Sequence, residues 1–445
     1  MLKKSIKIIL ILMILTFTLS LLLISPINRK PLSERDFYNT MRNYMDSLEI
    51  KSYHSESQLK AGWHRKNIIP DFEVPMAGYR PRKNFDQIHD TLFVHVLMLD
   101  NGLARVAFIS YDLLITPPLL KQRIEQSITD RIPEIDFVYF SATHTHNGIG
   151  GWDNSLGGQL MSGKYNEAIL DHLEKMTFKC LEQAYTNMGD AYLKYFEVNA
   201  EKYVRNRIDP SSAEDGMIRG IEVEQQSGQK AILTTYSAHA TNIPAKSRYI
   251  SGDYPAQLNK SLEQSGYDFA MFMAGAVGSH RLDTSEPKSL ELAKTTGVEL
   301  SKLISHTKTT TLPDSITIAF KEIDIELGES QLRISDNFHL RNWAFNAVFP
   351  PLKGEIKYLE IGNLLFLGMP CDFSGEILIK NDLYKLAEKL NKKLIVTSFN
   401  GNYIGYITED GHYDNSNNSE VREMNWVGPY HGDYFSEIIT LILEK

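Results

Sequence analysis

The fold of this chain is constrained most by a regular alternation of short apolar segments with longer amphipathic ones from residue 91 onward. Short apolar runs between turn residues are typical of buried strands, whereas longer runs with helical spacing indicate helices. This alternation predicts an α/β fold, a mixed β-sheet sandwich with flanking helices, rather than an all-β fold. The expected strands cover 91–99, 104–110, 137–141, 191–198, 218–223, 231–237, 269–273, 315–325, 364–367 and 394–398, and the expected helices cover 118–129, 164–186, 254–263, 290–304, 375–390 and 430–443.

One large domain accounts for most of the chain. Its 445 residues, 42% of them hydrophobic, can bury a large core, and no repeat, low-complexity tract or linker follows residue 60. We therefore expect a single catalytic domain over 61–445. Residues 28–60 are polar and charged, with a helix expected around 34–48, and are interpreted as a stalk or lead-in.

The N-terminal segment 1–27 has the pattern of a signal anchor. Lys3, Lys4 and Lys7 precede an almost uninterrupted apolar run over 8–24, which is at the short limit for crossing a bilayer. No small-x-small cleavage site follows it, which favours an uncleaved anchor over a cleaved signal peptide. Positive residues before the run keep the N-terminus cytoplasmic. The expected location is membrane-anchored, with the catalytic domain extracytoplasmic, either periplasmic or extracellular.

Charge and cysteine content exclude some classes of protein. The formal net charge of -8 provides no basic field for nucleic acid, so a nucleic-acid partner is not expected. Cys180 and Cys371 are the two cysteines of the chain, so there is no disulfide framework, although a single bridge stays open. The oligomeric state is not indicated by the sequence.

Two histidines, His144 and His146, directly follow the expected strand 137–141 and precede a glycine-rich turn. In α/β folds chemistry usually gathers at the carboxyl ends of strands. If strand geometry persists, residues two apart share one face, and both imidazoles can reach a common metal or water. The alternative is a pair of loop histidines bonded to neighbouring carbonyls.

Further polar residues stand where other expected strands end. His239 follows the strand 231–237, and Asp372 lies at a strand-to-helix junction. Each has an ordinary alternative role, since one carbonyl satisfies a histidine and an aspartate often caps a helix. A tyrosine-rich segment over 402–408 follows the last strand. Two histidines and a carboxylate would make a catalytic zinc site with open positions.

The order of these segments resembles the neutral/alkaline non-lysosomal ceramidase family, whose catalytic domain carries a Ser-x-Thr-His-Thr-His-x-Gly-x-Gly-Gly signature. Residues 141–151 have this signature, and the resemblance runs from about residue 70 to the last residues. Further segments resemble family motifs in the family's order: Val74-Pro75-Met76-Ala77-Gly78-Tyr79, Asn206-Arg207, His239, Tyr406-Ile407-Thr408 and Met424-Asn425-Trp426-Val427-Gly428-Pro429.

The resemblance implies a Zn²⁺ ion held by His144, His239, an acidic residue and Tyr406. It also implies that His146 and Arg207 bind the scissile amide or its oxyanion. Zinc would polarise the carbonyl, and a nearby imidazole could carry a proton to the leaving amine. Without the resemblance, Arg207 would be interpreted as an ordinary surface charge.

Several positions depart from the family pattern. The acidic ligand of the family is a glutamate, and Asp372 stands in its place, one methylene shorter. Arg281 stands where the family has a serine implicated in catalysis. Ser279 is close by and could attack if His280 or zinc activated it, although a turn serine is more often structural. Ser419 stands near a later family tyrosine, and no C-terminal immunoglobulin-like domain is expected.

Three hypotheses follow. The first is a zinc-dependent hydrolase of the neutral ceramidase type, which cleaves a lipid amide such as ceramide through zinc-activated water. The second keeps the metal-dependent hydrolase and changes the substrate to a non-lipid amide or ester. The third is a degenerate surface protein that keeps the fold without catalysis. The candidate catalytic residues are His146, Arg207 and Ser279, and the candidate metal ligands are His144, His239, Asp372 and Tyr406.

Overall fold

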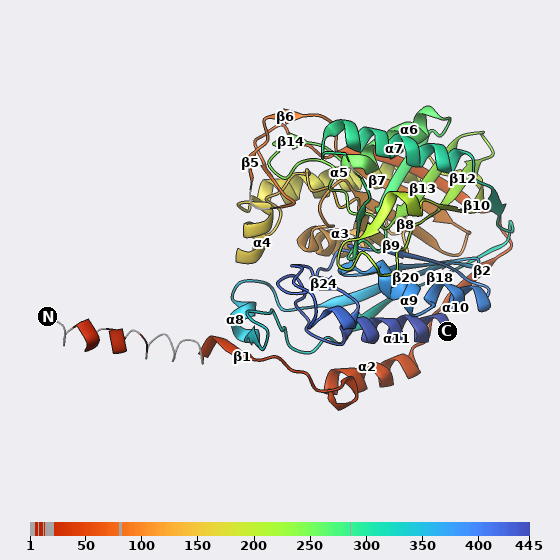
Figure 1. Ribbon diagram of the computed structural model, residues 1–445. Coiled ribbons are helices and arrows are strands. Elements are labelled where there is room, and N and C mark those ends of the chain that lie inside the picture. Colours follow the sequence, from red (N-terminus) through yellow and green to blue (C-terminus); the bar gives the residue numbers. More distant parts are fainter. Residues whose placement is uncertain (1–4, 8, 12, 14–21, 80–81, 285) are drawn as a thin grey trace.

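Two β-sheets pack face to face between two layers of helices in the computed structural model (Figure 1). The structure describes residues 5–7, 9–11, 13, 22–79, 82–284 and 286–445. The predicted class, a mixed α/β sandwich with flanking helices, is confirmed.

The larger sheet has nine strands in the order β15-β13-β12-β10-β3-β7-β8-β9, with β17 pairing to β10. Its end pairs, β8 with β9 and β13 with β15, are parallel, and the remaining pairs are antiparallel. The strands are β3 (Lys60–Asn67), β7 (Phe93–Asp100), β8 (Arg105–Tyr111), β9 (Phe137–Ala142), β10 (Gly189–Asn199), β12 (Met217–Gln225), β13 (Lys230–Tyr236), β15 (Phe269–Ala274) and β17 (Thr309–Thr311).

The smaller sheet has five strands in the order β2-β18-β20-β21-β23, and its β21–β23 pair is parallel. The strands are β2 (Ser52–Ser55), β18 (Ile316–Ile325), β20 (Gly354–Ile361), β21 (Leu364–Gly368) and β23 (Lys393–Thr397). Short two-stranded pairs lie around the sheets, among them β11 (Val204–Asn206) with β16 (His280–Leu282) and β22 (Asp372–Phe373) with β24 (Tyr406–Ile407).

The helices cover the outer faces of the two sheets (Figure 1). On the larger sheet lie α3 (Pro118–Arg131), α5 (Glu167–Thr186), α6 (Asp253–Gln264) and α7 (Leu290–Ser305). On the smaller sheet lie α2 (Asp36–Ser47), α9 (Gly375–Lys380), α10 (Leu383–Lys389) and α11 (His431–Leu443). Two short helices, α4 (Leu156–Ser162) and α8 (Asn342–Asn346), stand apart from these layers.

Three hydrophobic clusters follow from this layering. One fills the space between the sheets, where Phe108 and Phe366 meet edge to face at 5.1 Å. The other two lie under the helices on either side. Period-2 alternation in each strand supplies one face to the inter-sheet core and the other to the helices. Both sheets are therefore buried on both faces, which explains why their strands are so apolar.

The two cysteines are free and buried in different clusters. Cys180 belongs to α5 and faces the larger sheet, and Cys371 lies in the cluster between the smaller sheet and its helices. A bridge between them, which the sequence left open, is not formed.

Among the described residues, no helix is long and apolar enough to cross a membrane. Most of the apolar run over 8–24, on which the predicted anchor depends, lies outside the described residues. The last residue of the run, Ile24, begins strand β1 (Ile24–Pro26), which pairs with β19 (Phe338–Leu340). The expected lead-in helix is present as α2.

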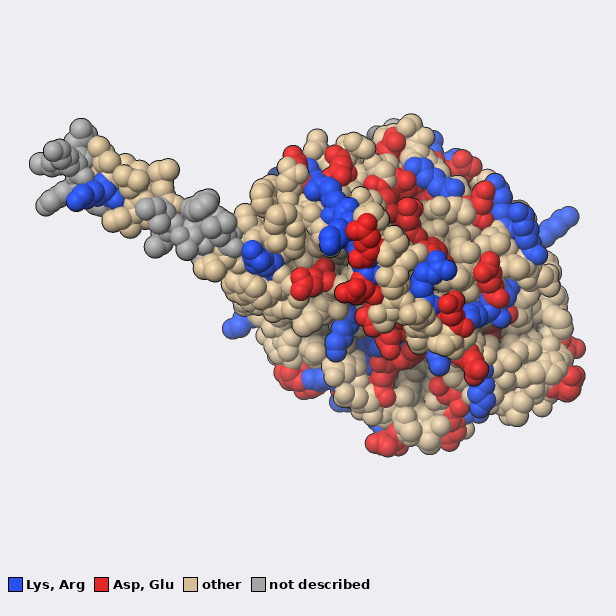
Figure 2. Space-filling model, turned by 90° about the horizontal axis from the view of Figure 1, so that it is seen from below, with Lys and Arg blue, Asp and Glu red and all other residues tan. Residues whose placement is uncertain are grey.

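Acidic and basic side chains are interspersed on the face that carries α2 and α11 (Figure 2). No broad basic field covers this face. The picture agrees with the net charge of -8.

Candidate metal centre

The carboxyl ends of parallel strands from both sheets meet at one place, and the candidate ligands lie there. His144 follows β9, His239 follows β13, Asp372 follows β21, and Tyr406 opens β24 after β23. Residues separated by more than 200 positions are thus brought together because each follows a strand that ends at the same edge. All four side chains are buried.

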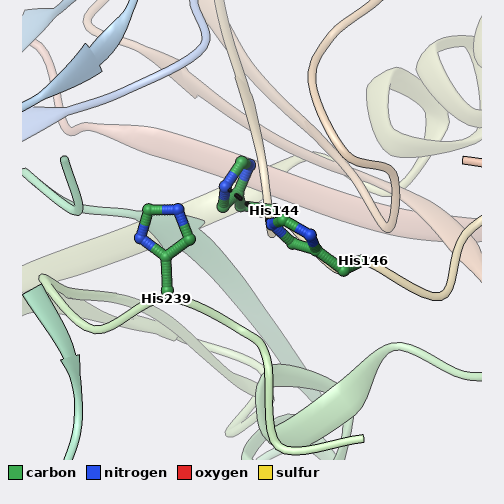
Figure 3. Close-up of side chains that lie close together, drawn as sticks. All are labelled: His144, His146 and His239. Carbon is green, nitrogen blue, oxygen red and sulfur yellow. Dashed lines mark hydrogen bonds between the residues drawn. The ribbon is translucent and has the colours of Figure 1, made fainter. Parts of the chain in front are cut away.

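Three imidazoles surround a common space (Figure 3). The nitrogens of His144, His146 and His239 lie within 4.8 Å of one another. His144 and His146 have their Nε2 atoms 3.2 Å apart. The strand ends at Ala142, and His144 has φ of 60°, in the left-handed region. The two histidines are therefore brought together by a turn and not by continued strand geometry.

The proton positions of the two buried histidines follow from their partners. His144 Nδ1 lies 2.6 Å from the carbonyl of Leu114, and His239 Nδ1 lies 2.9 Å from the carbonyl of Val277. Since a carbonyl only accepts, each Nδ1 carries the proton and donates it. Each Nε2 is left with a lone pair directed into the cluster, which is the state in which histidine binds a metal.

Asp372 brings a carboxylate to the same point. Its Oδ1 lies 3.4 Å from Nε2 of His144 and 3.3 Å from Nε2 of His239, and it has no hydrogen-bond partner. Tyr406 completes the group, with its hydroxyl 3.1 Å from Nε2 of His239. Two imidazole lone pairs therefore face a buried carboxylate oxygen, an arrangement of acceptors that a bound cation would satisfy.

Electrostatics keep the imidazoles neutral. Burial lowers the pKa of His144, although the Asp372 carboxylate opposes the shift. Burial, followed by the Arg207 charge, lowers the pKa of His239 well below its ordinary value. The pKa of His146 is also lowered well below its ordinary value, by burial and then by His144 and His239.

Arg207 brings a positive charge into contact with the cluster. Its Nη2 lies 3.2 Å from Nε2 of His239 and 3.2 Å from the hydroxyl of Tyr406, and its Nη1 pairs with Glu420 at 3.2 Å. Burial alone would lower the pKa of Arg207, but Tyr406 and Glu420 raise it above its ordinary value. The guanidinium therefore stays charged beside the candidate ligands, and it is not the surface charge that its residue type suggests.

Ser279 lies in a different group of buried polar residues. Its hydroxyl is 3.0 Å from His280 Nδ1 and accepts from the hydroxyl of Ser374 at 2.6 Å. His280 Nε2 accepts from the backbone N–H of Asp215 at 3.0 Å, so the proton of this imidazole is on Nδ1 and points at Ser279. An imidazole that donates to the serine cannot remove its proton. The structure thus does not bring Ser279 to the histidines or give it a base.

An apolar cleft leads to the cluster. It is lined by aromatic and aliphatic side chains and reaches His144, His146 and Asp372 at its floor. The main apolar lining residues are Leu114, Ile115, Trp152, Met161, Phe349 and Trp426. Such a cleft with a few convergent polar groups is the usual form of a small-molecule site.

Two residues of the site were missed by the sequence reasoning. Tyr403 donates to Asp372 Oδ2 at 2.8 Å, and Glu420 pairs with Arg207. Tyr403 belongs to the tyrosine-rich segment 402–408, which was noted in the sequence for Tyr406. Its position three residues before that candidate ligand was the signal that could have identified it. The glutamate is in an irregular loop, and nothing in its neighbourhood marks it.

The fold and the site define a mixed α/β sandwich protein with a candidate metal centre at the strand ends. Residues 68–271 match the family described as neutral/alkaline non-lysosomal ceramidase, N-terminal. The resemblance inferred from the motifs is therefore confirmed, and it supports a hydrolase. The matched segment includes His144, His146, Arg207 and His239 and ends before Asp372 and Tyr406.

Two solved structures share the fold. The neutral ceramidase from Pseudomonas aeruginosa matches with a TM-score of 0.75 and 15% sequence identity, over 88% of this chain and 75% of that chain. A structure described as a ceramidase complexed with C2 matches with a TM-score of 0.70 and 14% identity, over 86% of this chain and 74% of that one. At these identities the likeness shows the fold.

Proposed function

We propose that this protein is a zinc-dependent hydrolase that cleaves the amide bond of a lipid of the ceramide type. The observation that carries the proposal is the convergence of two imidazole lone pairs on the unpartnered, buried Oδ1 of Asp372, at the floor of an apolar cleft. A buried carboxylate oxygen without a donor is costly inside a protein unless a cation binds there.

The residues that would hold the metal are His144, His239, Asp372 and Tyr406. Their donor set of imidazole nitrogen and oxygen is the one that zinc prefers in catalytic sites. Bound there, zinc supplies a Lewis acid that polarises an amide carbonyl and makes water more acidic. The shorter aspartate is compatible with this role, since its oxygen already lies within 3.4 Å of both Nε2 atoms.

Arg207 and His146 would act on the substrate. The guanidinium of Arg207 stays charged and lies beside Tyr406, where it can bind the carbonyl oxygen as negative charge develops. Hydrolysis adds the hydroxyl of water to the carbonyl carbon, breaks the C–N bond and requires a proton on the leaving nitrogen. His146 is neutral and has an unpartnered Nδ1, so it can accept a proton from water and pass it on. Ser279 has no part in this proposal.

The cleft supports a lipid substrate. Its aromatic and aliphatic walls would bury an acyl chain, at roughly 0.8 kcal/mol for each methylene removed from water. A short non-lipid amide or ester would leave these walls exposed, which is why we place that substrate class second.

The proposed setting is a membrane surface. The apolar run over 8–24 would anchor the chain, residues 28–60 would form the lead-in, and the domain over 61–445 would act outside the cytoplasm. The support is the order of lysines and apolar residues in the sequence.

The first experiment measures zinc in the full chain, purified in detergent, by elemental analysis. We expect about one zinc per chain, lost in His144→Ala and in Asp372→Ala and retained in His306→Ala, which removes an exposed histidine. The second experiment compares fluorescent ceramides of short and long acyl chain with acyl-free amides. A folded chain without zinc after reconstitution would move the conclusion to the non-catalytic surface protein.

A further inference from the structure

The two oxygens of the Asp372 carboxylate have different surroundings. Oδ2 accepts a hydrogen bond from the hydroxyl of Tyr403 at 2.8 Å. Oδ1 has no hydrogen-bond partner and faces the Nε2 atoms of His144 and His239. One oxygen is therefore held, and the other is presented to the cluster.

The carboxylate of Asp372 needs a hydrogen bond of this kind to keep one orientation. The terminal torsion of aspartate is broad, so either oxygen can be turned toward a given point. In the absence of a cation, the lone pairs of Oδ1 and the two imidazole nitrogens repel one another, which favours rotation of the carboxylate away from the histidines. The hydroxyl of Tyr403 opposes this rotation by binding Oδ2.

The backbone fixes the donor relative to the acceptor. The segment that contains Tyr403 runs beside Asp372, because Ile404 N–H donates to the carbonyl of Pro370 at 2.9 Å and Asp372 N–H donates to the carbonyl of Gly405 at 3.1 Å. In the short parallel pair β22–β24, Asp372 and Tyr406 are register partners. The phenol and the carboxylate are thus held together by main-chain bonds on both sides.

The ring of Tyr403 is also fixed. It meets Trp426 edge to face, with centroids 5.3 Å apart and planes at 89°. Both rings line the apolar cleft. The hydroxyl cannot leave Asp372 without disturbing this contact.

We propose that Tyr403 is the positioning residue of the metal centre: its hydroxyl selects the orientation of Asp372 in which Oδ1 faces the two histidines. The segment 403–406 then supplies both a ligand, Tyr406, and the donor that orients another ligand. This inference rests on the proposed zinc site. Outer partners of this kind typically change metal affinity about 10–100-fold.

The test is Tyr403→Phe in the full chain, which removes the hydroxyl and keeps the ring against Trp426. Zinc affinity is measured by competition with a chromophoric chelator, and the cobalt-substituted protein is examined by absorption spectroscopy. We expect zinc binding to weaken about 10–100-fold and the cobalt spectrum to change. The matched control is Tyr434→Phe. Tyr434 lies in α11, and its hydroxyl donates to the carbonyl of Glu326 at 2.6 Å. Its zinc affinity and spectrum should equal those of the wild type.

A double mutant separates positioning from general loss of structure. The weakened cobalt affinity of Asp372→Ala, titrated at raised metal concentration, should not fall further when Tyr403→Phe is added, because the group that Tyr403 orients is gone. Wild-type affinity and spectrum in Tyr403→Phe would overturn the inference, and so would an equal loss in both backgrounds. Failure of the wild-type chain itself to bind zinc or cobalt would instead contradict the proposed function, so the two failures are distinguishable.

Discussion

Among the described residues, three groups each place three potential metal ligands within 4.8 Å of one another, and two of these groups differ sharply in chemistry. The histidine cluster consists of His144, His146 and His239, with Asp372 beside it. The glutamate cluster consists of Glu376, Glu409 and His412. The histidine cluster leaves acceptor atoms facing each other. In the glutamate cluster every carboxylate oxygen of Glu376 has donors.

The difference lies in the cations and hydroxyls that surround the glutamates. Glu376 accepts from Asn206 at 2.8 Å and from His412 at 3.0 Å, pairs with Lys380 at 2.8 Å, and also accepts from Ser212. These donors are part of the chain, so the cluster needs nothing from outside. Proximity of ligand types is therefore weak evidence for a metal, whereas a buried carboxylate oxygen that has no donor and faces two imidazole nitrogens is stronger evidence.

The largest expected effect comes from removing a histidine of the first cluster. His239→Ala should abolish stoichiometric zinc and lower hydrolytic activity by more than the roughly 10–100-fold typical of outer partners. The free energy of unfolding without metal should fall by about 1–3 kcal/mol, because the buried carbonyl of Val277 loses its donor and Arg207 and Tyr406 lose their acceptor. Elemental analysis, a substrate assay and urea unfolding measure the three quantities. Retained zinc with full activity would contradict the proposed ligand set.

A smaller loss is expected when the nearby cation is removed. Arg207→Gln should keep zinc and reduce kcat about 10²-fold, as loss of one donor to a developing oxyanion does. The matched control is Arg205→Gln, since that side chain is 41% exposed and pairs with Glu214 away from the histidines. Equal kcat values for the two variants would remove Arg207 from the proposed chemistry.

The glutamate cluster should respond in stability rather than in metal content. Burial alone would raise the pKa of Glu376, but hydrogen bonds from His412, Lys380 and Ser212 lower it to about 2, below the ordinary value of 4.5. A lowered pKa stabilises the fold above the ordinary value, and this contribution is lost as pH falls from 4.5 toward 2. Glu376→Gln should therefore lower the free energy of unfolding by about 2 kcal/mol at neutral pH and flatten its decline in acid.

Urea unfolding at a series of pH values between neutrality and pH 3 checks this prediction. Zinc content at neutral pH should be unchanged in Glu376→Gln. An identical decline of stability in acid for variant and wild type would show that Glu376 is not held in this way. Loss of zinc from the variant would show that the two clusters are not independent.

The smallest effect is expected at Ser279. Because His280 donates to this hydroxyl and cannot remove its proton, Ser279→Ala should change kcat/KM less than about threefold while costing roughly 1 kcal/mol of stability. Steady-state kinetics and thermal unfolding measure the two effects. A hundredfold loss of activity in a stable variant would restore the serine as a nucleophile.

Much of the fold could be predicted because most strands are apolar on both faces. All ten expected strands and the expected helices are present, with ends that differ by a few residues. Strands β3 and β20 were missed for physical reasons. The strand β3 contains four positively charged or imidazole side chains and Gly62, and β20 places Lys357 inside the protein at 0% exposure, where Glu125, Glu322 and Glu355 neutralise it. Hydropathy does not register an ion pair that forms between distant segments.

One expected helix, 375–390, is divided into α9 and α10. Asp382 between them has φ of 51°, a left-handed conformation that ends helical hydrogen bonding. The helical periodicity continues across the break, so the sequence pattern concealed it. Asn381 and Asp382 tolerate such turns better than other residues, which was the only local signal.

The candidate site could be predicted in composition but not in geometry. Strand ends identified His144, His239 and Asp372, and the family resemblance added Arg207 and Tyr406. The proton positions could not be foreseen, since they depend on carbonyls of Leu114 and Val277 from other segments. The same limit applied to Ser279, whose partner His280 is oriented by a backbone N–H more than sixty positions earlier in the chain.

The left-handed backbone of His144 strains the fold at a residue whose side chain is a proposed metal ligand. A residue with a Cβ atom at φ of 60° costs about 1–2 kcal/mol relative to glycine, and this cost is present whether or not metal is bound. His144→Gly would remove this strain, but it would also remove a buried imidazole that donates to the carbonyl of Leu114 and stacks on Phe399 at 4.3 Å, so the substitution costs more stability than it restores. The side-chain contacts that direct Nε2 into the cluster are thus the same ones that hold the strained turn, and a more durable fold cannot be reached at this position by giving up the proposed ligand.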